Sequence, residues 1–405
     1  MKKMENRGLG TGSQKHIKDN NKKVILRLML NQGPLTKKEI SKLTKLSVVS
    51  VTSNMDELLK LGAIVEETHN EETSYGRKPM VYNVNPRFRC LLSVDLGKEL
   101  VDISLGDMCY HLIASDTYQI TEAVGAHEMM EDIMGKIESL LNKNQVSPEQ
   151  IGSLALANPG VVYDDSGRIL KPAKMAKKWA DLPLREMFQE RFGCATAVMN
   201  DIDMAALGYQ ALCKREELPE NYLYLRVDAG LGMGVIVDGQ LLKCSYGSAG
   251  EIGYATLLRE DGSWEMVDYE TIASLSALLG SVKEKLDAHR DSSLYQATKG
   301  DPERVTLELI AETAGKDAWL QAEISSVTTH IATIAVNGML LLGINSVVID
   351  GGILLLKEWF TEPFYRMLRE KNVLKREPHL NVAAPYSAIY GGLQLGRNLV
   401  IEHDL

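Results

Sequence analysis

The chain has 405 residues, of which 45% are hydrophobic and 24% are charged, a composition that is typical of globular domains and argues against an intrinsically disordered chain. Its length suggests two or three domains, each large enough to bury its own core. The five cysteines are widely spaced without a metal-binding pattern, and we find neither a secretory signal nor an unbroken apolar run long enough to cross a membrane. We therefore expect a soluble, cytoplasmic protein with reduced thiols.

The net charge of −9 is distributed unevenly along the chain. Residues 1–89 hold 17 basic and 9 acidic residues, a net charge of +8, whereas the remaining residues hold 28 basic and 45 acidic residues, a net charge of −17. A basic module on an acidic body predicts that nucleic acid binds the N-terminal part of the chain.

The basic N-terminal part has the element order of a winged helix-turn-helix. Three helices are predicted: from Ile17 to Gly33-Pro34, after the capping box of Thr36 and Glu39, and from Ser47 to Gly62. The residues predicted to form their buried faces are Ile17, Val24, Ile25, Leu28, Met29, Ile40, Leu43, Val51, Met55, Leu58 and Leu59. Two β-rich runs, 64–67 and 80–84, then predict the hairpin that forms the wing.

The outer face of the third helix is the predicted base-reading surface. Its small hydroxyl and apolar side chains are Ser47, Val48, Val49, Ser50, Thr52 and Ser53. Hydroxyls can bond to base edges or phosphates, and valines suit the thymine methyl group. Lys37 and Lys38 would face phosphates, as would Lys42 and Lys45, and Arg77 with Lys78 at the wing tip could enter a minor groove. The alternative is that these side chains form an ordinary solvated surface.

After residue 89 the pattern changes to strands separated by glycine-rich loops. The predicted segments are a strand, a turn at Gly97 and a second strand over 90–105; a buried strand over 153–162 that turns at Pro159-Gly160; a strand and helix over 196–208 with Asn200 and Asp201 at their junction; a hairpin over 223–239 with a glycine-rich tip; a glycine-rich loop over 246–254 that carries Glu251; and paired glycines between strand or loop and helix at 347–353 and 389–396.

The order of these motifs resembles the ROK family of repressors and sugar kinases, and the resemblance extends from about residue 17 to about residue 400. The motifs that carry it are Asp95-Leu96-Gly97, Asn158-Pro159-Gly160, Trp179 with Leu182-Pro183-Leu184, Asn200-Asp201, Gly230 to Gly234, Gly250-Glu251-Ile252-Gly253 and Asp350-Gly351-Gly352. With a winged helix in front of them, the chain is most similar to the repressor branch, of the xylose and N-acetylglucosamine repressor type.

The resemblance implies an α/β fold in which a winged helix-turn-helix precedes a two-lobed, actin-like ATPase body of the sugar-kinase type. The implied domains are a DNA-binding domain over 1–89, a first lobe over 90–200 to which residues 385–405 return, and a second lobe over 201–384 with the ligand cleft and the dimerisation surface.

The resemblance also implies a sugar site. Asp201 stands where family kinases keep the base that takes a proton from a sugar hydroxyl. The implied ligand-binding residues are Asn158, Gly160, Asn200, Asp201, Glu251 and Tyr254. Asp201 could also cap the helix that follows it, and Tyr254 could be a wall of the cleft. The four lysines within residues 171–178 indicate either a solvated loop or a phosphorylated or acidic ligand.

Departures from the kinase pattern predict that the protein does not catalyse the phosphorylation of its sugar. Lys98-Glu99-Leu100 follows the first loop in place of the kinases' Gly and Thr, and Asp228-Ala229 adds a carboxylate to the second loop, where it would repel a polyphosphate. Tyr254 replaces the histidine of zinc-bearing members, and no cysteine cluster follows. We therefore expect no catalytic residue, no cofactor and no metal, with Asp201 as the vestige of the base.

The expected function is a carbohydrate-responsive repressor. We expect a homodimer or dimer of dimers on a palindromic double-stranded operator, with a sugar or sugar phosphate that closes the lobes and alters operator affinity. Two alternatives stay open at this point: a sugar kinase with an appended DNA-binding domain, and a repressor that is controlled by a protein partner.

Overall fold

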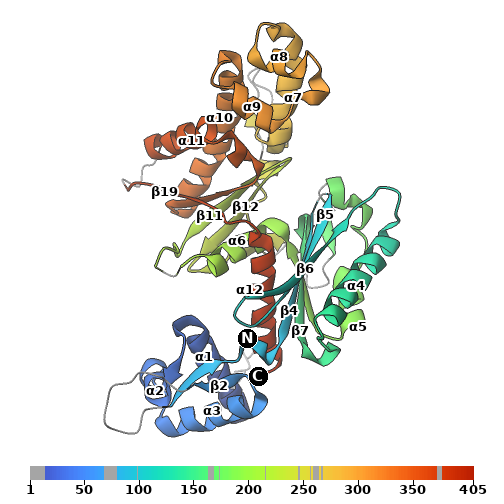
Figure 1. Ribbon diagram of the computed structural model, residues 1–405. Coiled ribbons are helices and arrows are strands. Elements are labelled where there is room, and N and C mark those ends of the chain that lie inside the picture. Colours follow the sequence, from blue (N-terminus) through green and yellow to red (C-terminus); the bar gives the residue numbers. More distant parts are fainter. Residues whose placement is uncertain are drawn as a thin grey trace, which may run out of the picture.

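The computed structural model describes residues 14–67, 80–97, 99–162, 168–172, 174–214, 216–244, 247–255, 257–258, 264–265, 268–371 and 376–405. Three units follow one another along the long axis of the molecule: a small domain of helices and short strands, a first α/β lobe and a second α/β lobe (Figure 1). A single C-terminal helix, α12 (Ser387–His403), runs from the second lobe past the first to the small domain.

The small domain is a winged helix-turn-helix. It contains α1 (Gln14–Gln32), α2 (Lys37–Thr44) and α3 (Val48–Leu61), with β1 (Leu35–Thr36), β2 (Ile64–Glu67) and β3 (Val81–Val84) in the sheet order β1-β3-β2. The three helices, the wing hairpin and the predicted caps are confirmed. Thr36 and Glu39 form the capping box of α2, and Gly62 ends α3 in the left-handed conformation with a φ of 76°. The short strand β1 was not predicted.

The predicted buried face of α1 is partly wrong. Ile25 and Met29 are buried, but Ile17 and Val24 are 55% and 47% exposed, and Leu26 is buried in their place. The buried face begins at Lys22 and repeats at i, i+3, i+4 and i+7, which adds Ile25, Leu26 and Met29. The aliphatic stem of Lys22 is buried while its ammonium group pairs with Asp19 and Glu57. Because a lysine reads as polar, the sequence does not show that this position is buried.

Two leucines also depart from the predicted buried faces. Leu43 in the last turn of α2 is exposed, because Ile40 makes the core contact of that short helix. Leu59 in α3 is half-buried.

The first lobe is a five-stranded sheet in the order β10-β7-β4-β5-β6. Its strands are β4 (Cys90–Leu96), β5 (Leu100–Gly106), β6 (Leu112–Gln119), β7 (Ile151–Asn158) and β10 (Ala195–Asn200). β10, β7 and β4 are parallel, and β4, β5 and β6 form an antiparallel meander. Helices α4 (Ala126–Lys143) and α5 (Leu184–Phe192) cover one face, and α12 covers the other. A short hairpin, β8 (Gly160–Val162) with β9 (Ile169–Pro172), follows β7.

The second lobe is a five-stranded sheet in the order β13-β12-β11-β18-β19. Its strands are β11 (Tyr222–Val227), β12 (Leu231–Val237), β13 (Gln240–Leu241), β18 (Ser346–Asp350) and β19 (His379–Val382). The helices on one face are α7 (Leu275–Lys285), α8 (Ser293–Thr298), α9 (Leu307–Thr313), α10 (Ala318–Leu342) and α11 (Glu358–Lys371). Helix α6 (Asp201–Leu212) packs against the other face.

Alternation along β11 separates the two cores of the second lobe. Leu223 and Leu225 pack on the side of α10, whereas Tyr222 and Tyr224 pack on the side of α6. The same alternation places Arg226 on the α6 side, at the end of the strand. The sequence of β11 is mostly hydrophobic, but its one charged residue, Arg226, therefore points toward the first lobe.

Helix α10 meets the length and composition of a membrane-spanning helix, but half of its most apolar window is buried inside the second lobe. Leu320, Ile331 and Met339 from this helix belong to the hydrophobic core of the lobe. It is thus the core helix of an α/β layer.

Helices α6 and α12 pack with almost no side chain between them. A Cβ on Gly208 would lie 1.6 Å from the Ser387 carbonyl oxygen, and a Cβ on Gly391 would lie 1.7 Å from that of Met204. The paired glycines at 389–396 thus lie inside a helix, where they allow backbone contact, and not before one as predicted.

Candidate ligand cleft and DNA-binding surface

A cleft of about 370 Å³ opens between the two lobes, a size suited to a small molecule. Residues of both lobes line it: Asp95, Leu96, Gly97, Pro159, Gly160, Asn200, Asp201, Ile202, Arg226, Asp228, Ala229, Gly230, Leu231, Gly232, Met233, Gly250, Glu251, Gly253, Tyr254 and Glu270. Of the six residues predicted to bind a ligand, the structure places all but Asn158 in this lining.

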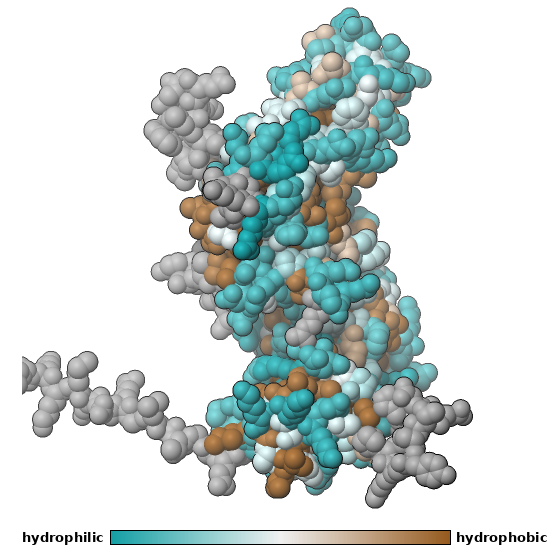
Figure 2. All heavy atoms as spheres, turned by 90° about the vertical axis from the view of Figure 1, so that its left-hand side faces the viewer, coloured by the Kyte–Doolittle hydropathy of each residue, from teal (hydrophilic) through white to brown (hydrophobic). Residues whose placement is uncertain are grey.

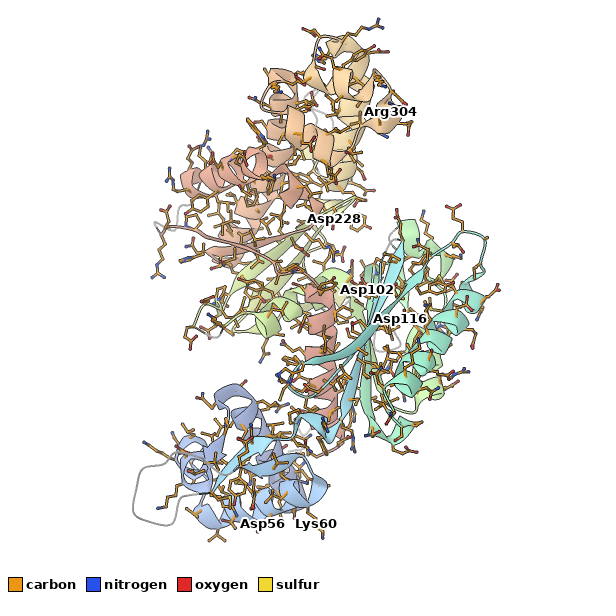
Figure 3. The ribbon with its side chains drawn as sticks, viewed as in Figure 1. Asp56, Lys60, Asp102, Asp116, Asp228 and Arg304 are labelled. Carbon is orange, nitrogen blue, oxygen red and sulfur yellow. The ribbon has the colours of Figure 1, made fainter. Side chains whose placement is uncertain are left out.

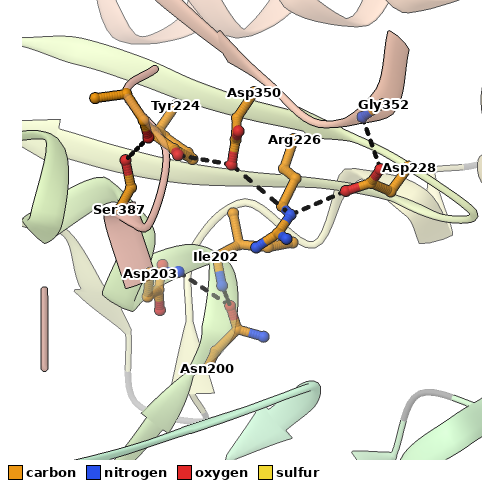
Figure 4. Close-up of polar contacts among 10 residues, drawn as sticks. Asn200, Ile202, Asp203, Tyr224, Arg226, Asp228, Asp350, Gly352 and Ser387 are labelled. Carbon is orange, nitrogen blue, oxygen red and sulfur yellow. Dashed lines mark hydrogen bonds and ion pairs between the residues drawn. The ribbon is translucent and has the colours of Figure 1, made fainter. Parts of the chain in front are cut away.

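Asn200 is the N-cap of α6. Its Oδ1 accepts hydrogen bonds from the backbone N–H groups of Ile202 at 2.9 Å and Asp203 at 3.1 Å (Figure 4), and its Nδ2 donates to the Gly160 carbonyl at 3.0 Å. The capping role considered for Asp201 was therefore assigned to the wrong residue. Because its amide is engaged in these bonds, Asn200 fixes the positions of Asp201 and Gly160 at the cleft.

Two carboxyl groups from different lobes, Asp95 at the end of β4 and Asp201 at the start of α6, share the floor of the cleft. Burial raises the pKa of Asp201. Burial, followed by the charge of Asp201, raises the pKa of Asp95 to about 7, against the opposing effect of Arg226. Near neutral pH, Asp95 is therefore partly protonated and can donate a hydrogen bond as well as accept one.

Arg226 is a charged residue of the cleft that the sequence patterns did not reveal. Its Nε lies 3.1 Å from Asp228 Oδ2 and 3.7 Å from Asp350 Oδ2, and Tyr224 donates its hydroxyl hydrogen to Asp350 at 2.7 Å (Figure 4). Burial opposes the charge of Arg226, but the carboxylates around it, with Asp201 foremost, raise its pKa. The guanidinium thus remains charged.

Asp228 lies on the side of the second lobe that faces the first (Figure 3). Its Oδ1 accepts a hydrogen bond of 2.7 Å from the N–H of Gly352, the first residue of the 3₁₀ helix that follows β18. The carboxylate that was expected to repel a polyphosphate is thus itself bound in the glycine-rich loop.

The lining of the cleft also contains Glu251, Tyr254 and Glu270. Burial and the negative charges of Glu251 and Glu270 raise the pKa of Tyr254, so its hydroxyl stays protonated and can donate. Glu270 was not predicted, because no glycine-rich motif adjoins it. A Cβ on Gly230 would lie 2.7 Å from Glu270 Oε2, so the carboxylate rests against bare backbone.

Asn158 supports the cleft from behind and does not line it. Its side chain is fully buried, and its Oδ1 accepts a hydrogen bond of 2.9 Å from the indole N–H of Trp179. Trp179 and Leu184 are core residues of the first lobe. The structure therefore does not place Asn158 in the lining of the cleft, and its contact with a ligand stays a prediction.

Helix α3 lies on the side of the winged-helix domain that points away from the body, as the positions of Asp56 and Lys60 show (Figure 3). In its first turn, Val48 is 53% and Val49 is 81% exposed. Ser47 caps the helix by accepting a hydrogen bond from the Ser50 N–H at 3.2 Å.

The remaining residues of the predicted reading face and the surrounding lysines differ in exposure. Ser53 is exposed, whereas Ser50 and Thr52 are half-buried. Lys38 is exposed, but Lys37 contacts Asp56 at 3.2 Å and lies over the Tyr82 ring. The predicted wing-tip residues Arg77 and Lys78 lie outside the described residues, as do the side chains of Lys171 and Lys174 in the lysine-rich loop.

Among the residues that the structure describes, no group of three or more His, Cys, Asp or Glu side chains could hold a metal ion.

A model of the ROK family matches residues 91–389. The xylose repressor of Caldicellulosiruptor bescii is 27% identical over 322 residues, which span 75% of this chain and 79% of that protein. A solved ROK family transcriptional regulator, a homolog of the Escherichia coli MLC protein, has a TM-score of 0.79 at 22% identity, over 96% of this chain and 97% of its own. A ROK family glucokinase from Streptomyces griseus, in complex with glucose and AMPPNP, has a TM-score of 0.62 at 18% identity, over 76% of this chain and 99% of its own.

The family model covers most of the chain, and the chain therefore belongs to the ROK family. The likeness to the transcriptional regulator spans the winged-helix domain as well as the body, whereas the likeness to the glucokinase covers a smaller share. The fold is a winged helix-turn-helix followed by the two-lobed, actin-like body of the sugar kinases.

Proposed function

We propose that the protein is a repressor of carbohydrate-metabolism genes, and that a sugar in the cleft between the lobes shifts its affinity for an operator. The observation that carries the proposal is that one chain joins the exposed first turn of α3 to a cleft lined by Asp201 and Glu251. The similarity to a protein named xylose repressor supports this function and makes xylose the first sugar to test. Such a regulator works in the cytoplasm.

The polar groups of the cleft suit a polyhydroxy ligand. A sugar hydroxyl donates one hydrogen bond and accepts others, so it is best held by a mixture of acceptors and donors. The carboxylates of Asp201, Glu251 and Glu270 supply acceptors, and the Tyr254 hydroxyl and the partly protonated Asp95 supply donors. We assign these five side chains to the sugar.

DNA binding is tested by selecting duplexes from a random pool with the full chain and comparing selected with scrambled duplexes. The proposal predicts an affinity ratio of at least about 10³ at physiological salt, and a log affinity that falls linearly with log salt. Equal affinity for selected and scrambled duplexes would contradict sequence-specific DNA binding and therefore the proposed repressor function.

The body senses the sugar and does not phosphorylate it in this proposal. The support is the bound carboxylate of Asp228 in the second glycine-rich loop, where it opposes the approach of a polyphosphate. A coupled ADP-release assay over a panel of sugars tests this point. Sugar-dependent turnover that Asp201→Asn abolishes would establish the kinase instead.

A two-fold symmetric dimer on a palindromic operator is the assembly that we propose. Winged helices that read two half-sites require such symmetry. Hydrophobic residues gather over the second lobe on the face turned to the viewer in Figure 2, and Leu341 and Val382 of this lobe are 84% and 56% exposed. Light scattering of the purified chain, with and without operator DNA, measures the assembly, and a monomer on DNA would contradict it.

A further inference from the structure

Asp228 joins three segments of the second lobe. Its Oδ1 accepts from the Gly352 N–H at 2.7 Å, and its Oδ2 accepts from Arg226 Nε at 3.1 Å (Figure 4). Its backbone carbonyl accepts from the N–H of Leu275 at 2.8 Å. Both carboxylate oxygens are therefore held by donors, although the side chain lies at the wall of an open cleft.

The loop that receives this carboxylate is bare backbone. Gly351 has a φ of 100°, and a Cβ there would lie 2.4 Å from the Val227 carbonyl oxygen. A Cβ on Gly352 would lie 3.1 Å from Asp228 Oδ1. A glycine N–H that an oxyanion approaches this closely, with a guanidinium on the other side, is the arrangement by which proteins hold phosphate groups.

The charge of Arg226 is already matched within the chain. Asp228 and Asp350 both lie within ion-pair distance of its Nε, and the Tyr224 hydroxyl holds Asp350 in place. An external anion would have to displace Asp228, which is tethered to the same hairpin and is therefore present at high effective concentration. Without the Asp228 carboxylate, Arg226 would retain one contacting carboxylate and the Gly352 N–H would lose its acceptor.

We propose that Asp228 is an internal anion that fills a phosphate-binding position, and that it is the residue that excludes nucleotides from this end of the cleft. Its removal exposes a latent site for inorganic phosphate between the Gly352 N–H and Arg226. The inference rests on the part of the proposed function in which Asp228 opposes a polyphosphate, and it is independent of the sugar and of the operator. ADP release tests phosphorylation and phosphate titration tests the latent site, so the two can fail separately.

Isothermal titration of the full chain with inorganic phosphate tests the proposal. We expect no saturable binding of phosphate to the wild type. We expect saturable binding to Asp228→Ala and Asp228→Ser, with a Kd at least tenfold below the highest phosphate concentration at which the wild type shows no binding. Adding Arg226→Gln to Asp228→Ala should abolish the gain. Asp287→Ala, which removes a carboxylate that is 74% exposed in the same lobe, is the matched control and should behave as the wild type.

Thermal melting verifies that each variant is folded, and the serine variant keeps a hydroxyl that can accept the Gly352 N–H if the alanine variant does not fold. Phosphate binding to the wild type as tight as to the variants would overturn the proposal. Folded Asp228 variants that bind phosphate no better than Asp287→Ala would overturn it as well.

Discussion

Val49 has the most exposed hydrophobic side chain among the described residues of the winged-helix domain, at 81%. A valine that contacts no core at the second position of α3 is placed to meet a thymine methyl group. We predict that Val49→Asp weakens operator binding at least about tenfold, because a carboxylate there faces the DNA phosphates.

An acidic residue in the first turn of a helix is favourable to the helix dipole, so Val49→Asp should not lower the melting temperature. His127→Asp, at an exposed position in the first turn of α4, is the control and should bind the operator as the wild type does. An unchanged operator affinity of Val49→Asp in a gel-shift titration would show that α3 does not read DNA.

Asp95 makes the stability of the protein depend on pH in the direction opposite to that of most carboxyl groups. Its pKa is raised from 3.8 to about 7, so the folded chain binds more protons than the unfolded chain between these values. The free energy of unfolding therefore falls as the pH rises from about 4 to about 7 through this group, and it stays low above 7.

Replacing Asp95 with Asn should remove that dependence. We predict that Asp95→Asn is more stable than the wild type at pH 8 by about 1–2 kcal/mol, since partial exposure screens the repulsion, and that the difference vanishes near pH 4. Urea denaturation at several pH values measures it, with Asp287→Asn as the control. A difference that does not vary with pH would contradict the raised pKa.

Some residues of the cleft were predictable from the sequence and others were not. Glu251 stands in a glycine-rich loop, and Asp201 stands at the junction of a predicted strand with a predicted helix, so both positions could be found in the sequence. Arg226 lies within a hydrophobic strand, and its partner Asp350 is more than a hundred residues further along the chain. Only the pairing of β11 with β18 brings the two together.

At the scale of elements, the α6–α12 contact depends on glycine. A Cβ on Gly391 would lie 1.7 Å from the Met204 carbonyl oxygen, which no side-chain rotation can relieve. We predict that Gly391→Ala lowers the free energy of unfolding by about 3 kcal/mol or more. Gly135→Ala in α4, where a Cβ meets nothing within 4 Å, should instead be neutral or stabilising by up to about 1 kcal/mol. Equal stabilities of the two variants in urea would refute the close packing.

The ends of the helices were predicted well, because they depend on local chemistry. The buried faces of the helices were predicted less well. The capping box of Thr36 and Glu39 and the left-handed Gly62 set helix ends through bonds within a few residues. The face of α1 depends on what packs against it, and the buried stem of Lys22 makes that face look polar. The extent of α12 was missed because its glycines resemble a loop until α6 is placed against it.

At the scale of the whole molecule, α12 connects the ligand cleft to the DNA-binding domain. Near its start it packs against α6, whose first residue is Asp201. Near its end, Glu402 forms ion pairs with Lys23 and Arg27 of α1, and Asp404 pairs with Arg89 at 2.7 Å. Hydrophobic residues of α12 and of the winged helix also share one core. We therefore expect a lobe movement at Asp201 to reach the winged helix through α6 and α12.

This connection accounts for a change in operator affinity only if the ligand prefers one conformation, and allosteric coupling of this kind is typically worth about 1–3 kcal/mol. The central claim, that a sugar in the cleft controls operator binding, is tested by titrating sugars into the protein–operator complex. The sugars are xylose, glucose, N-acetylglucosamine, xylose 5-phosphate, glucose 6-phosphate and N-acetylglucosamine 6-phosphate.

We predict that one of these sugars changes the Kd for the operator at least about fivefold, and that Asp201→Asn binds the same operator without responding to the sugar. No response to any sugar, or a full response in Asp201→Asn, would contradict the claim that the cleft between the lobes controls DNA binding.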